Sequence, residues 1–84
     1  MNDARLLQEL EAVASELSVE VRHEDLEGSR GGLIRLRGQT CILLDLDLSI
    51  PERLELMARA LARLPLEDVF LRPAVQELLR DRAS

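Results

Sequence analysis

The apolar positions at the start of the chain have the spacing of one helical face. They recur at steps of three and four residues. They are Leu6, Leu7, Leu10, Val13, Ala14 and Leu17. Asn2 or Asp3 can cap the first turn, because a short polar side chain accepts a hydrogen bond from the free N–H groups there. The pattern predicts a helix over residues 3–17 with its apolar side toward a core.

The period of the pattern then changes from about four to two. Apolar and polar residues alternate in the segments 18–24 and 33–37, which predicts two strands. The segment 40–46 is apolar at most positions on both faces, which indicates a more central strand that is covered in part on both sides. Residues 24–32, with three glycines, are predicted to be a loop. Gly38-Gln39 is predicted to form a tight hairpin turn.

Two further helices follow the strands. Ser49 and Glu52 have the spacing of a capping box, so a helix is predicted from there to about Arg63. Pro65 ends that helix, and Pro73 opens a last helix that runs to about Arg82. The predicted inward residues of these helices are Leu54, Met57, Ala58, Leu61, Val75, Leu78 and Leu79.

The succession of these elements predicts an α+β fold in the order α-β-β-β-α-α. A small, mostly antiparallel three-stranded sheet is expected to be packed by the helices. A chain of 84 residues has room for one core, so residues 1–84 are expected to form a single domain. That core must be aliphatic, because Phe70 is the only aromatic residue.

The charge balance limits the possible partners. The chain has 11 basic and 16 acidic residues and a formal net charge of −5, and the basic residues are interleaved with carboxylates. Nucleic-acid binding needs clustered positive charge, so no nucleic acid is expected as a partner. No run approaches the roughly 20 apolar residues of a membrane span, and the charged N-terminus is unlike a signal peptide. We expect no membrane partner and a cytoplasmic location.

The residues that most often carry catalysis are isolated in this sequence. His23 is the only histidine and Cys41 the only cysteine, and they fall on different predicted strands. A zinc site or a catalytic triad needs partners at set spacing. We interpret His23 as a half-buried strand residue and Cys41 as a small buried apolar residue, with no catalytic, metal or cofactor role.

The acidic residues leave one alternative open. Asp45 and Asp47 share one side of the end of the predicted strand 40–46, and Glu67-Asp68 could come close to them. Converging carboxylates bind hard cations, so this group, with His23, is the basis of an alternative reading as a metal-dependent or hydrolytic enzyme. A solvated strand end explains the same residues without an ion.

Arginines are the candidates for contact with a partner. Arg35 and Arg37 are predicted on one face of a strand, where they could flank Arg22 in a basic stripe or pair with Glu20 or Glu24. A further arginine lies at the tip of the glycine-rich loop. The predicted partner-binding residues are Arg22, Arg30, Arg35 and Arg37.

Three stretches over residues 5–64 form a familiar pattern. They are Glu16-Leu17-Ser18-Val19-Glu20-Val21-Arg22, Gly31-Gly32-Leu33 and Leu48-Ser49-Ile50-Pro51-Glu52-Arg53. The pattern resembles the front half of the ImmA/IrrE family of zinc peptidase domains. In that family the next helix carries His-Glu-x-x-His, whereas residues 54–64 contain no histidine. The resemblance therefore implies a scaffold without the zinc site, and no catalytic or metal residue carries over.

These observations favour a non-catalytic interaction module, an adaptor or regulator that binds another protein and could also form a homodimer. The strands 18–24 and 33–37 are the predicted sheet edges, which are available for pairing, and the outer face of the last helix is another candidate surface. The alternatives are the enzyme with the acidic group and a transcription-associated regulator.

Overall fold

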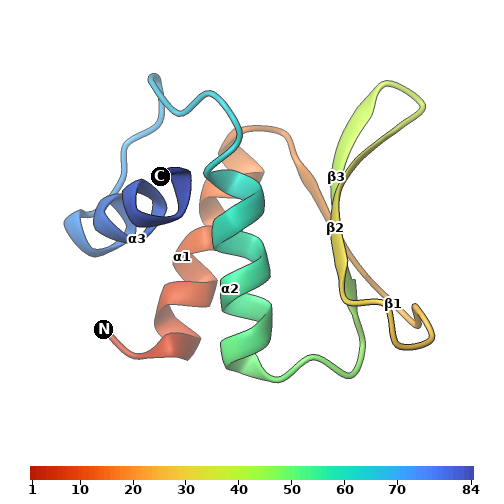
Figure 1. Cartoon of the computed structure of the whole chain (residues 1–84). Coiled ribbons are helices and arrows are strands. Elements are labelled where there is room, and N and C mark those ends of the chain that lie inside the picture. The colour runs from red at the N-terminus through yellow and green to blue at the C-terminus, as the bar shows by residue number, and fades with distance from the viewer.

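The computed structural model describes all 84 residues as three helices and a three-stranded sheet (Figure 1). The elements are α1 (Asp3–Glu16), β1 (Glu20–Glu24), β2 (Gly31–Leu36), β3 (Gln39–Asp45), α2 (Ile50–Leu61) and α3 (Pro73–Ala83). The predicted α+β class and the order α-β-β-β-α-α are confirmed. Asn2 caps α1, and the predicted capping box of Ser49 and Glu52 begins α2.

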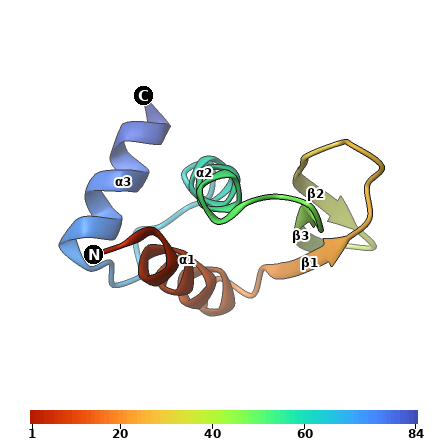
Figure 2. The ribbon, with the colours of Figure 1, turned by 90° about the horizontal axis from the view of Figure 1, so that it is seen from below.

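The strand order in the sheet is β1-β3-β2. The central position predicted for residues 40–46 is therefore confirmed. The predicted edge strands, 18–24 and 33–37, correspond to β1 and β2, which lie at the two edges of the sheet. β1 runs parallel to β3, while β2 and β3 form an antiparallel hairpin, so the sheet is mixed and the description as mostly antiparallel needs this correction. The reason is the connection after β1, which passes the end of β3 and brings the chain to the opposite edge (Figure 2).

The helices form two layers on the same side of the sheet. α1 and α2 lie side by side over one face, and α3 crosses behind them on the side away from the strands (Figures 1 and 2). The core between these layers contains 14 buried aliphatic residues and includes Ile42 and Leu44 of β3. The predicted inward residues of α3 also pack here: Val75 and Leu79 are buried, and Leu78 packs against the core. The other face of the sheet carries no helix.

The strand boundaries differ from the sequence prediction for local backbone reasons. Ser18 has φ 59° and ends α1, with the N–H of Val19 donating to the Ala14 carbonyl over 2.8 Å, so β1 begins only at Glu20. The hairpin turn is Arg37-Gly38, with φ of 54° and 79°, and not Gly38-Gln39. Two consecutive positive φ angles are typical of the turn that matches the twist of a hairpin.

Strand β2 begins at Gly31, two residues earlier than predicted, because glycine allows a close approach of two backbones. Gly31 has φ +120°, and a Cβ atom there would lie 2.0 Å from the carbonyl oxygen of Leu43. Residues 31 and 32 therefore join the ladder opposite Leu44 and Leu43 in place of the loop that the glycines suggested.

We expect Gly31→Ala to lower the free energy of unfolding by more than about 3 kcal/mol, because it combines backbone strain with a backbone clash. The matched control is Gly28→Ala, which also has a positive φ but no atom within 4 Å of the added Cβ. The control is expected to cost about 1 kcal/mol. Urea unfolding of both variants gives the comparison, and equal losses would contradict the close approach.

A charged clamp joins α3 to α2. The Glu55 carboxylate accepts two hydrogen bonds from Arg82, of 2.6 and 2.8 Å, and one of 2.9 Å from Arg59. Hydrogen bonds from Arg82 and then Arg59 lower the pKa of Glu55 from 4.5 to about 2. The clamp holds the C-terminal part of α3 against the outside of α2.

We expect Glu55→Gln to lower the free energy of unfolding at pH 7 by about 1 kcal/mol. The amount is modest because the side chains of Glu55 and Arg82 are each about a third exposed, and solvent screens their ion pair. The folded pKa lies below the ordinary value, so this contribution is complete above pH 4.5 and is lost as the pH falls toward 2. Unfolding measured at pH 7 and pH 3 tests the sign. Glu77→Gln, an exposed glutamate of α3 outside every ion pair, is the control.

Candidate functional site

The face of the sheet away from α1 and α2, called here the outer face, carries no helix (Figures 1 and 2). Directly opposite residues of paired strands share a face, and neighbours along a strand alternate. Ile42 and Leu44 point toward α1 and α2 and are fully buried. Cys41 and Leu43 therefore point outward, together with their partners across the sheet.

Apolar side chains gather on the β2 and β3 half of the outer face. Ile34 lies opposite Cys41, Gly32 opposite Leu43, and Leu36 opposite Gln39. Ile34 and Leu43 are half-buried but neither belong to the core nor pack against it, and Leu36 is 41% exposed. We call Ile34, Leu36, Cys41 and Leu43 the outer apolar strip.

The β1 half of the outer face is charged. Glu20, Arg22 and Glu24 lie opposite Cys41, Leu43 and Asp45, and Arg22 forms an ion pair of 2.8 Å with Glu24. The two edges of the sheet are therefore chemically different. The β1 edge has charged side chains along its outer face, while the β2 edge adjoins the outer apolar strip.

Cys41 lies between these halves and is only 1% exposed, which confirms the prediction of a small buried residue. Its Sγ is 3.5 Å from Glu20 Oε1. Loss of hydration, followed by the hydrogen bond and the negative charge of Glu20, raises the pKa of the thiol. A thiol with a raised pKa holds its proton at neutral pH, so it is a poor nucleophile.

The predicted basic stripe of Arg22, Arg35 and Arg37 does not form. Arg35 lies opposite Thr40 and donates to Thr40 Oγ1 over 3.2 Å and to the Gly38 carbonyl over 2.9 Å, whereas Arg22 lies opposite Leu43. Thr40 and Leu43 are three residues apart on one strand, so the two arginines are on opposite faces. Arg37 is in the turn rather than in the strand.

The four predicted arginines fall into separate environments. Arg30, just before β2, forms an exposed ion pair of 3.3 Å with Glu52 at the start of α2. Arg35 and Arg37 are at the opposite end of β2, are exposed, and have no carboxylate within ion-pair distance. The structure thus brings Arg35 and Arg37 together at the hairpin end and separates them from Arg22 and Arg30.

The predicted acidic group is also dispersed. Asp45 is 5% exposed, and its carboxylate accepts the N–H of Leu26 over 2.8 Å and that of Asp47 over 3.2 Å. Asp47 precedes α2 while Glu67-Asp68 follows it, and a helix of 12 residues is about 18 Å long. No three His, Cys, Asp or Glu side chains are placed to share a metal ion.

Through these two hydrogen bonds, the Asp45 carboxylate instead links the loop after β1 to the turn before α2.

His23, the remaining candidate, is exposed on β1 opposite Leu44 and not half-buried as predicted. The outer apolar strip was not predicted as a candidate surface. Its signal was present in residues 40–46, whose two apolar faces predicted cover in part on both sides, while helices pack on only one face.

No family model matches the chain, and no curated protein or solved structure matches it. No helix has the length and apolar character required to cross a membrane. The resemblance of residues 5–64 to the ImmA/IrrE family stays a prediction.

We expect Asp45→Asn to lower the free energy of unfolding by about 1–3 kcal/mol, because the amide replaces one accepting oxygen with a donor that faces an N–H group. The amides of Leu26 and Asp47 are expected to exchange with deuterium faster. Asp47→Asn is the control, since its exposed side chain makes no hydrogen bond in the structure. Equal stability of the two variants would show that the Asp45 carboxylate does not hold the loop and the turn together.

Proposed function

We propose that this chain is a non-catalytic, cytoplasmic protein-interaction domain, and that an extended segment of a partner protein pairs with the β2 edge. The observation that supports this proposal is the outer apolar strip, which lies next to a free edge and on which no helix packs. Leu36 is exposed, and Ile34 and Leu43 are only half-buried. Apolar surface gains free energy when water is removed from it, so a partly exposed strip next to an open strand favours a partner.

The β2 edge is the better of the two edges for an added strand. A free edge offers unpaired N–H and C=O groups along its length, and natural proteins protect such edges with charges, proline or bulges. β2 begins with Gly31-Gly32, which carry no side chains, and contains no proline. The side chains of an added strand would alternate between the faces, and those on the outer face would extend the strip beyond Ile34 and Leu36.

The charges near the edge define the chemistry of the partner segment. Arg35 and Arg37 have no carboxylate partner although acidic residues outnumber basic ones in the chain. An acidic residue of the partner near the hairpin end would neutralise them. The proposed occupant is therefore an extended segment with apolar residues at alternate positions and an Asp or Glu beside the hairpin.

Selection from a library of random peptides tests this proposal without knowledge of the natural partner. We expect the selected peptides to combine alternating apolar residues with a carboxylate, and to slow the amide exchange of β2 when bound. Ile34→Ser is expected to weaken the selected peptides by roughly tenfold, because it removes a large apolar contact on the outer face. Ile50→Ser, which removes a 44% exposed isoleucine at the start of α2, is expected to leave binding unchanged.

A charge reversal completes the test. Arg37→Glu is expected to weaken acidic peptides, while Arg5→Glu makes the same charge change on α1, away from the sheet. Selected peptides that protect amides elsewhere, or that bind the Ile34 and Ile50 variants equally, would contradict the proposal. Protection of β2 that grows with protein concentration and accompanies a dimer in sedimentation would replace the partner segment with a second copy.

A further inference from the structure

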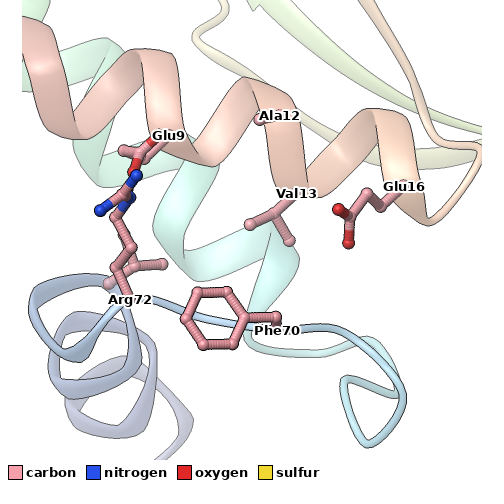
Figure 3. Close-up of a pocket in the computed structure, with 7 residues that line it drawn as sticks. Glu9, Ala12, Val13, Glu16, Phe70 and Arg72 are labelled. Atoms are coloured by element: carbon pink, nitrogen blue, oxygen red, sulfur yellow. The ribbon is translucent and has the colours of Figure 1, made fainter.

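The only aromatic side chain of the protein is exposed to solvent. Phe70 is 80% exposed in the segment between α2 and α3, although its neighbours Val69 and Leu71 pack against the core. Phe70 lies over a hollow of about 160 Å³ between this segment and α1 (Figure 3). The segment that carries Phe70 lies on the side of α1 and α2 away from the sheet, so the hollow is separate from the β2 edge (Figure 1).

The hollow has an apolar floor and one glutamate at each end. Val13 and Val75 are buried and form the floor. Glu9 forms an ion pair with Arg72 at one end, so its charge is neutralised within the chain. Glu16 is exposed, lines the other end, and forms no ion pair. Figure 3 shows Val13 between the Glu16 carboxylate and the Phe70 ring.

We propose that this hollow binds an arginine side chain of a partner protein. A guanidinium group is flat and weakly hydrated, so it stacks on an aromatic face and pairs with a carboxylate at its edge. Phe70 offers the face and Glu16 the carboxylate, while the methylene groups of the arginine would lie over Val13. At the other end of the hollow, Arg72 of this chain makes the same kind of contact with Glu9 of α1.

Size and charge favour a single cationic side chain over other ligands. Sites for drug-sized molecules have volumes from about 300 Å³ upward. The hollow, of about 160 Å³, has room for one side chain. The net charge of −5 favours the approach of a cation over that of an anion.

Titration of acetyl-arginine methylamide into the isotope-labelled protein tests the proposal by NMR. We expect saturable shifts of the amides of residues 12–16 and 69–75, with millimolar affinity. The ring of Phe70 is expected to move the δ-methylene signals of the probe upfield, and Phe70→Leu is expected to abolish that movement. Because Phe70 is exposed, its substitution leaves the core intact.

Charge is tested with one variant, one matched control and one neutral probe. Glu16→Gln is expected to weaken the probe roughly fivefold, because it removes the carboxylate partner. Glu11→Gln, an exposed glutamate of α1 outside the hollow, is expected to have no effect. Acetyl-citrulline methylamide has nearly the same shape without the charge and is expected not to bind.

Two results would overturn the proposal. One is the absence of saturable shifts in residues 12–16 and 69–75. The other is equal binding of the arginine and citrulline probes, which would indicate that the hollow takes uncharged ligands. Neither result concerns the β2 edge, so the two proposals fail separately.

Discussion

The burial of Ile42 and Leu44 of β3 beneath α1 and α2 is the packing interaction on which the rest of the structure depends. Both residues are fully buried and belong to the one core of the chain. Because Ile42 and Leu44 lie on the central strand β3, β1 and β2 are the two edge strands of the sheet. Because α1 and α2 are the only helices next to the sheet, the side chains that point the other way have no helix over them. Ile34, Leu36 and Leu43 therefore stay partly exposed, while Cys41 is buried. The outer apolar strip is therefore a direct consequence of how the core is built.

The helices and the central strand could be predicted because each is encoded locally. The apolar steps of α1, the capping box of α2 and the apolar run of β3 need no knowledge of the rest of the chain. The mixed sheet could not be predicted in this way, since a period of two reports a strand but not its neighbour or direction. The start of β2 was missed for a related reason: Gly31 indicates a loop by its composition, but its contact with the Leu43 carbonyl exists only once two strands have met.

The residues of the candidate site depend even more on contacts between distant segments, which local sequence patterns do not report. The predicted arginine stripe failed because a turn one residue earlier than expected removed Arg37 from the strand, and because the register places Arg22 and Arg35 on opposite faces. Asp45 belongs to a loop contact that no local pattern announces. In α2, Met57, Ala58 and Leu61 are fully buried. Aliphatic packing therefore occupies the inward face of the helix where the resemblance to zinc peptidases would place metal ligands.

The two proposed surfaces differ in the sign of their charge as well as in their position. At the hairpin end, Arg35 and Arg37 have no carboxylate partner. In the Phe70 hollow, Glu16 forms no ion pair, and Val13 lies between its carboxylate and the aromatic ring. They lie on opposite sides of the α1 and α2 layer, so a partner on one does not obstruct the other (Figure 2). Under the two proposals, these surfaces of opposite charge, separated by a packed helix layer, would let the same chain bind an acidic strand and a basic side chain at once, as an adaptor does.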